Sequence, residues 1–129
     1  MATRIREKAK TRKENADARA FAVVKYVRMS PSKVRITLDT IRGKKVEEAM
    51  AILANQTTAA AEVCLKLVKS AVANAENNKG LVKEDLIVDE CYVCPGPTLK
   101  RLDIRARGRA NRLLKRTCHI TVYVDTVKE

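Results

Sequence analysis

Two pairs of cysteine and histidine residues are the first candidates for chemistry in this sequence. Cys91 and Cys94 form a Cys-x-x-Cys pair, and Cys118 and His119 are adjacent. Such residues bind zinc, and a Cys-x-x-Cys pair also supports redox chemistry. Consecutive strand residues point to opposite faces, so Cys118 and His119 cannot both turn toward one ion, although Cys91 and Cys118 could face each other at the base of a hairpin. A thioredoxin-like pair needs a helix start in a βαβ context, which the pattern lacks. We therefore expect reduced thiols, no metal and no other cofactor.

Catalysis by acids, bases or nucleophiles has little support. His119 has no nucleophile or carboxylate at a suggestive spacing, which favours a structural or RNA-facing histidine. Asp85, Asp89 and Glu90 are close together in sequence, but acidic residues beside a neutral strand are usually solvated. We do not expect an enzyme.

Arginine is the most concentrated functional side chain. Residues 95–118 contain eight Lys or Arg and one Asp. From Arg101 to Ala110, arginines occupy odd-numbered positions and small or aliphatic residues occupy even-numbered positions. The guanidinium fork matches two phosphate oxygens at once, and small neighbours allow close approach of a nucleic-acid backbone. The alternation and the excess of Arg over Lys favour phosphate recognition over a solvated charge run.

Positive charge is segregated along the chain. The net charge is +12; residues 1–13 contribute +5 and residues 95–118 contribute +7. The rest has thirteen basic and thirteen acidic residues and is neutral. This distribution predicts a neutral globule with two basic arms that bind a polyanion.

The binding features that the sequence lacks indicate which kind of polyanion it binds. The four aromatic residues occupy core-facing or strand positions, so no stacking platform for single strands is predicted: Phe21, Tyr26, Tyr92 and Tyr123. A helix-turn-helix at 31–54 would start its recognition helix with Glu47 and Glu48, which would repel phosphates. No aromatic or bulky apolar face accompanies the charge, which disfavours a membrane surface. Flexible basic arms favour a large folded RNA.

The apolar pattern predicts the elements that position these residues. We expect a strand at 21–29, a helix from Pro31 to Gly43, a helix at 46–54, a helix from about residue 58 to 78, and strands at 86–93 and 119–127. Ser30 is a plausible N-cap, and Gly80 ends the long helix. The order predicts an α+β fold, with three helices packed on a small antiparallel sheet. We expect one domain over residues 20–129 and a disordered basic arm over residues 1–19.

The basic segment joins the last two strands, so residues 95–118 are predicted to form a long hairpin that projects from the sheet. Gly108 lies near its middle, where a turn needs a residue that tolerates positive φ. At about ten residues per strand the hairpin would extend about 34 Å. Because an isolated two-stranded ribbon is marginal in water, it should become ordered when counter-charges surround it.

The location is predicted to be the cytoplasm. No apolar run approaches the length of a membrane span, and residues 1–13 lack the apolar core and cleavage site of a secretory signal.

Six blocks of the sequence resemble one family. They are YVRMSPSKVR (26–35), IRGKKVEEAMAIL (41–53), KSAVANAENN (69–78), GPTLKR (96–101), RARGRANRLLKRT (105–117) and CHITVYV (118–124). Together they resemble protein twenty-two of the large ribosomal subunit in its bacterial form. The resemblance covers about residues 20–125.

The resemblance implies a structural, non-catalytic protein of the large subunit. It implies a globule on the subunit surface and a hairpin that threads through large-subunit ribosomal RNA, with its tip in the wall of the nascent-peptide exit tunnel. The implied RNA-binding residues are Arg28, Ser30, Lys33, Arg35, Lys100, Arg101, Arg105, Arg107, Arg109, Arg112, Lys115 and Arg116. The implied tunnel-lining residues are Leu99, Lys100, Arg101, Arg105, Ala106, Arg107, Gly108, Arg109 and Ala110.

The implied partners are ribosomal RNA, neighbouring large-subunit proteins and the nascent polypeptide, without a membrane or a homo-oligomer. The arm at residues 1–19 is longer than the family minimum, and Cys91 and Cys94 replace other residues found in many members, so neither feature inherits a role. Two alternatives remain open from the sequence: a free-standing RNA- or DNA-binding regulator that uses the same hairpin, and a small metal or thiol protein.

Overall fold

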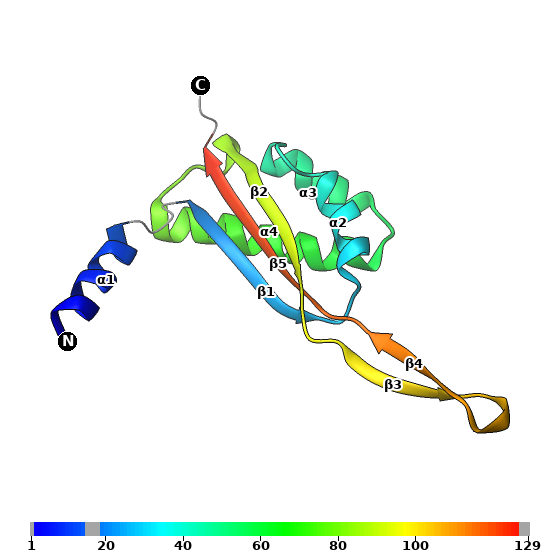
Figure 1. Cartoon of the computed structure of the whole chain (residues 1–129). Coiled ribbons are helices and arrows are strands. Elements are labelled where there is room, and N and C mark those ends of the chain that lie inside the picture. Colours follow the sequence, from blue (N-terminus) through cyan, green and yellow to red (C-terminus); the bar gives the residue numbers. More distant parts are fainter. Residues whose placement is uncertain (1, 15–18, 127–129) are drawn as a thin grey trace.

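The predicted strands and long helices are all present in the computed structural model, which describes residues 2–14 and 19–126 (Figure 1). In chain order they are α1 (Ala2–Glu14), β1 (Ala20–Val27), α2 (Pro31–Asp39), α3 (Val46–Asn55), α4 (Ala59–Lys79), β2 (Leu86–Pro95), β3 (Leu99–Ile104), β4 (Ala110–Lys115) and β5 (Cys118–Thr126). Short 3₁₀ turns occur at Lys83–Asp85 and Ala106–Gly108. The α+β class is confirmed, with α2, α3 and α4 on one side of the sheet.

The main sheet is antiparallel, with strand order β1-β5-β2. Val122, in the central strand, lies opposite Ala22 of β1 and Cys91 of β2. Alternate residues of β5 are fully buried beneath the helices, as the sequence alternation predicts: Ile120, Val122 and Val124. The sheet therefore has one buried face and one open face.

The helix boundaries follow local sequence signals. α2 starts at Pro31, whose fixed φ suits the first helical turn, after Ser30 in extended backbone. The Ser30 hydroxyl does not cap the helix; it lies 3.0 Å from the hydroxyl of Ser32. α4 ends at Gly80, whose φ of +63° places it in the left-handed region that favours glycine.

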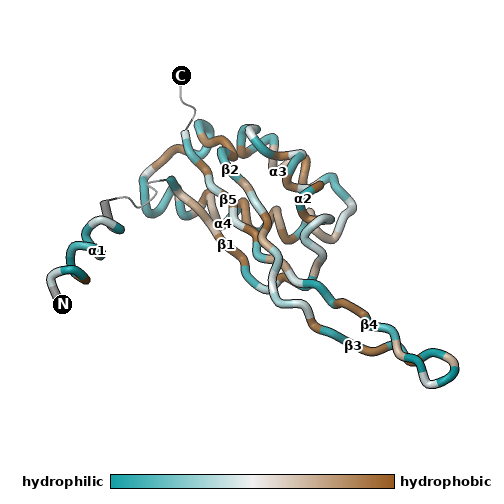
Figure 2. The backbone as a smooth tube through the Cα atoms, in the orientation of Figure 1, coloured by the Kyte–Doolittle hydropathy of each residue, from teal (hydrophilic) through white to brown (hydrophobic). Residues whose placement is uncertain are grey.

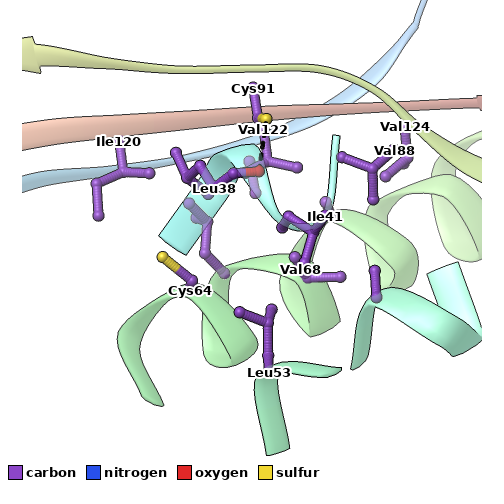
Figure 3. Packing of buried hydrophobic residues seen from close by; sticks show 14 of the residues in the cluster. Leu38, Ile41, Leu53, Cys64, Val68, Val88, Cys91, Ile120, Val122 and Val124 are labelled. Carbon is purple, nitrogen blue, oxygen red and sulfur yellow. Dashed lines mark hydrogen bonds between the residues drawn. The ribbon is translucent and has the colours of Figure 1, made fainter. Parts of the chain in front are cut away.

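The core is built from aliphatic and small side chains (Figure 3). Leu38 and Ile41 come from α2 and its following turn, Leu53 from α3 and Val68 from α4. Buried alanines along α4 bring its backbone close to the sheet and to α3: Ala60, Ala61, Ala71 and Ala75. No aromatic side chain belongs to the buried core of the described residues.

The outer edge of β2 is covered by the segment after α2. The amide of Gly43 donates to the Val88 carbonyl (2.8 Å), and the Val88 amide donates to the Lys44 carbonyl (2.9 Å). The Arg42 guanidinium donates to the Cys91 carbonyl at 2.9 Å. These bonds satisfy backbone groups that an exposed edge strand would offer to another chain.

The basic hairpin forms a second sheet of its own, β3 with β4, which projects beyond the ends of β2 and β5 (Figure 1). Its register runs from Leu99 opposite Lys115 to Ile104 opposite Ala110. At the base, the Gly96 amide donates to the Thr117 carbonyl (2.9 Å), and the Thr117 hydroxyl donates to the Pro97 carbonyl (2.6 Å). The predicted hairpin is present, but it is interrupted at this base instead of continuing the main sheet.

The N-terminal arm differs from the prediction. Disorder is expected over residues 1–19, whereas residues Ala2–Glu14 form α1, which lies apart from the sheet (Figure 1). The segment is rich in Ala, Arg, Lys and Glu, which have high intrinsic helix propensity and need no packed face to favour a helix. Residues 1 and 15–18 lie outside the described residues, and the domain division at residues 19 and 20 stays a prediction.

The four aromatic residues lie on strands, as the sequence predicted, but they do not enter the core. Phe21, Tyr26 and Tyr92 are exposed, because the core is filled by aliphatic residues. The basic ribbon also contains exposed aliphatic residues, and the hydropathy colouring of Figure 2 shows brown segments along the tube of β3 and β4. Among the described helices, none combines the length and apolarity required to cross a bilayer.

Candidate nucleic-acid interface

The β3–β4 ribbon has cations on both faces. Residues that oppose each other in an antiparallel pair share a face. Arg101 opposes Leu113 on one face, and Leu102 opposes Arg112 on the other. In residues 101–110 arginines alternate with small or aliphatic residues along the sequence. The folded ribbon does not keep the two kinds on separate faces, because the cations of each strand lie opposite aliphatic residues of the other strand.

The ribbon is almost entirely exposed. Every residue of β4 is exposed, and in β3 only Asp103 is partly covered. The exposed aliphatic side chains are Leu99, Leu102, Ile104, Leu113 and Leu114. A surface that alternates cations with aliphatic groups suits a partner that offers both phosphates and apolar sugar or base edges.

The tip concentrates three arginines in a tight turn. The Arg105 amide donates to the Arg109 carbonyl at 2.8 Å. Arg107 (φ +58°) and Gly108 (φ +70°) are both left-handed, so the turn uses two such residues where the sequence indicated one. Arg105 pairs with Asp103 at 2.7 Å, an exposed ion pair that orients the guanidinium at small energetic benefit.

The base of the ribbon brings the predicted globular RNA motif against the returning strand. The Arg28 guanidinium donates to the Lys115 carbonyl at 3.1 Å. A hollow at this junction is lined by Ser30, Pro31, Ser32, Arg35, Pro95 and Arg116. It combines two hydroxyls, two guanidinium groups and the amino end of α2, a set of donors with the chemistry of a phosphate site. We name this hollow the base site.

Arg35 serves the base site and the fold together. One of its guanidinium nitrogens lies 3.4 Å from the Val93 carbonyl, which ties α2 to β2. Lys33 is exposed in the first turn of α2 and does not line the hollow. Most of the predicted residues thus form two groups, the base site and the ribbon with its tip. Arg28 bonds to the ribbon without lining the hollow, and Lys33 is separate from the hollow.

Sequence reasoning missed the roles of Ser32, Pro95 and Arg19. Ser32 and Pro95 line the base site, although they are distant in sequence and only tertiary packing joins them. Arg19 pairs with Asp89 and with Glu90 (3.1 Å), so these two carboxylates belong to an ion-pair network. That network is consistent with the non-catalytic interpretation of these acids.

The cysteines of the described chain form neither a disulfide nor a metal site. All four thiols are free, and no group of three metal-binding side chains occurs among the described residues. The suggested pairing of Cys91 with Cys118 is wrong, because Cys91 opposes Val122 while Cys118 opposes Pro95. Burial raises the pKa of the Cys64 thiol to about 12 and also raises the pKa of Cys91 and Cys118, so these thiols are protonated near neutral pH.

His119 has a structural contact. Its Nδ1 accepts a hydrogen bond from the backbone amide of Tyr26 at 2.9 Å, and the two rings meet edge to face with centroids 4.8 Å apart. Tyr26 has a φ of +59° in the bulged end of β1, and this bond helps to hold that unusual conformation.

Comparison with known proteins is decisive for the family. Residues 22–125 match the model of the family described as ribosomal protein L22p/L17e. This chain belongs to that family. The match includes the whole main sheet apart from its ends, the base site and the ribbon, and it confirms the resemblance seen in the sequence blocks.

Several bacterial relatives share most of this sequence. The large ribosomal subunit protein uL22 of Clostridium novyi is 56% identical over 105 residues, which is 81% of this chain and 95% of the relative. That of Desulforamulus reducens is 52% identical over 110 residues (85% and 97%), and that of a Thermotoga species is 56% identical over 111 residues (85% and 70%).

Membership establishes a structural constituent of the large ribosomal subunit, without enzymatic activity, as expected. Bacterial large subunits are cytoplasmic, which agrees with the predicted location. A free-standing regulator and a metal or thiol protein are no longer needed to explain the basic hairpin.

Proposed function

We propose that this protein binds large-subunit ribosomal RNA through the base site and the ribbon, and that the ribbon tip lines the nascent-peptide exit tunnel. One observation carries the proposal: the cations of residues 99–116 lie on an exposed two-stranded ribbon that leaves the main sheet and contributes nothing to the buried core. Such an element gains its stability from a polyanion around it.

The base site and the ribbon would make different contacts with RNA. The base site would fix the globule on RNA phosphates, because Arg35 within it is held by the Val93 carbonyl and the neighbouring Arg28 by the Lys115 carbonyl. The cations along β3 and β4 would neutralise phosphates on both faces: Lys100, Arg101, Arg112 and Lys115. The residues proposed to face the tunnel are Leu99, Lys100, Arg101, Arg105, Ala106, Arg107, Gly108, Arg109 and Ala110.

RNA contact is tested by directed cleavage in purified large subunits. In a Cys94→Ser background, an iron chelate attached to Cys introduced by Arg101→Cys or Arg112→Cys should cleave ribosomal RNA within the chelate's reach. The matched control is Lys66→Cys, on the solvent side of α4, where the side chain is 73% exposed. Equal cleavage from Lys66→Cys, or none from the ribbon positions, would refute RNA binding by the ribbon.

Tunnel lining is tested with ribosomes that hold a stalled nascent chain. A photoreactive residue in the chain should cross-link to residues 105–110, and the cross-link should disappear when residues 98–116 are replaced by a two-residue turn. Cross-links confined to residues 28–35 would contradict the placement of the tip.

A further inference from the structure

The open face of the main sheet carries a row of aromatic rings. The rings of Phe21 and Tyr123 lie with centroids 5.5 Å apart, and those of Tyr123 and Tyr92 are 6.3 Å apart. These residues belong to β1, β5 and β2, so the row crosses all three strands. Their sequence neighbours Ala22, Val122 and Cys91 are buried under the helices, which places the rings on the opposite side.

This row is an exposed apolar surface. Phe21 is 48% exposed and Tyr92 is 39% exposed, and Val23, two residues after Phe21 on the same strand, is 42% exposed. Large aromatic groups contribute more to a core than aliphatic ones do, yet this chain leaves all three rings of the row outside its core. Contiguous apolar surface of this kind is typical of a contact with another molecule.

The charges beside the rings indicate what that molecule is. Asp89 and Glu90 lie in the middle of β2, where Glu90 is opposite Tyr123, and Asp125 follows Tyr123 by two residues on β5. The Arg19 guanidinium lies 4.7 Å from the centre of the Tyr123 ring and pairs with both Asp89 and Glu90. The face therefore already binds one guanidinium in the manner of a cation–π and carboxylate site.

We propose that this surface, named the aromatic face (Phe21, Tyr92, Tyr123, Asp89 and Glu90), docks an extended, lysine- or arginine-rich segment of a neighbouring large-subunit protein. Apolar stems of such side chains pack on rings while their charged ends reach the carboxylates. RNA is disfavoured here, because acidic groups repel phosphates and the cation at the face is held by two carboxylates. The proposal rests on membership of the ribosomal family and is independent of where the ribbon tip lies.

The first test uses purified large subunits that contain the full chain. Benzoylphenylalanine replaces Phe21, and in a matched control it replaces Lys66 on the outer side of α4. The expected product is a cross-link from position 21 to a peptide of another large-subunit protein, with Lys or Arg within a few residues of the attachment point. A cross-link to ribosomal RNA, a cross-link to residues 1–14 of this chain, or no product above the Lys66 control would overturn the proposal.

The second test uses the free full-length protein and two probes, an octa-arginine peptide and an octa-uridylate. Nuclear magnetic resonance should show the peptide shifting the ring signals of Phe21, Tyr92 and Tyr123, and the Asp89→Asn/Glu90→Gln variant should weaken peptide binding at least tenfold. The matched control Glu62→Gln/Asp39→Asn removes two exposed carboxylates elsewhere and should leave binding within twofold. Ring shifts caused by the oligonucleotide, or equal loss in both variants, would refute the proposal, whereas failure of RNA binding by the ribbon would leave these results unchanged.

Discussion

Single residues at the ribbon base decide whether the two chain segments there can approach each other closely enough to begin the hairpin. Gly96 is the sharpest case, because a Cβ added there would lie 2.5 Å from the Thr117 hydroxyl oxygen and 3.1 Å from the His119 ring. Thr117 is itself buried and bonded to the Pro97 carbonyl, so it cannot move away without losing that bond. The close approach of the two strands at this point therefore requires glycine.

We expect Gly96→Ala to lower the free energy of unfolding by about 1–3 kcal/mol, the usual range for an added group in a tight site. Chemical denaturation measures the change. Thr117→Ala should remove the steric conflict, so the double variant Gly96→Ala/Thr117→Ala should lose less than the sum of the single variants. Strict additivity of the two losses would show that the clash is not the cause.

The thiols offer a second prediction at this scale. Cys94 is exposed, whereas Cys64, Cys91 and Cys118 are buried with raised pKa values. In the native protein at pH 8, one of the four thiols should react rapidly with an aromatic disulfide reagent, and Cys94→Ser should abolish that fast phase. Rapid reaction of more than one thiol would contradict the buried core. Denaturant should expose all four.

At the scale of elements, the ribbon and the main sheet are separate units. Within residues 2–14 and 19–126, β3 pairs only with β4, and the buried core draws on β1, β2, β5 and the three helices that cover them. Leu99, Leu102 and Ile104 remain exposed, so the ribbon has no apolar face against the globule. Its order in the assembled particle is consequently expected to depend on RNA.

Replacing residues 98–116 with a two-residue turn should therefore leave the globule folded, with cooperative thermal unfolding and a midpoint within a few degrees of the parent. Circular dichroism follows the transition. The replacement should spare the bond between the Gly96 amide and the Thr117 carbonyl, which closes the main sheet. A broad, non-cooperative transition would mean that the ribbon belongs to the folding unit.

At the scale of the whole molecule, the net positive charge lies on segments outside the packed core. Residues 95–118 contribute +7, and the residues outside this segment and the first thirteen are neutral overall. The aromatic face adds an apolar surface with two carboxylates on the open side of the sheet, away from the helices. We propose that the basic projection binds RNA and that the aromatic face binds a basic protein segment.

Affinity for a large-subunit RNA fragment should consequently depend steeply on salt. If about eight phosphates are neutralised, a log–log plot of affinity against salt should have a slope of about −6 to −7. Alanine at Lys100, Arg101, Arg112 and Lys115 should reduce the magnitude of that slope by about 3. A slope near zero in the parent protein would rule out the electrostatic mechanism.

The sequence by itself determined the α+β order, the start of α2, the end of α4 and the projecting basic hairpin, whereas it placed the end of α2 at Gly43 and the helix ends at Asp39. These features depend on local periodicity, on Pro31 and Gly80, and on charge density, all of which act over a few residues. It also carried the family resemblance, because the matching blocks are continuous stretches of chain.

Only the tertiary structure decided which residues meet. The pairing of β3 with β4 placed cations on both ribbon faces, and packing of α2 beside the ribbon base joined Ser32 to Arg116. The aromatic rings proved to lie outside the core because aliphatic side chains already fill the space between sheet and helices. Register and packing depend on partners distant in sequence, so local patterns cannot specify them.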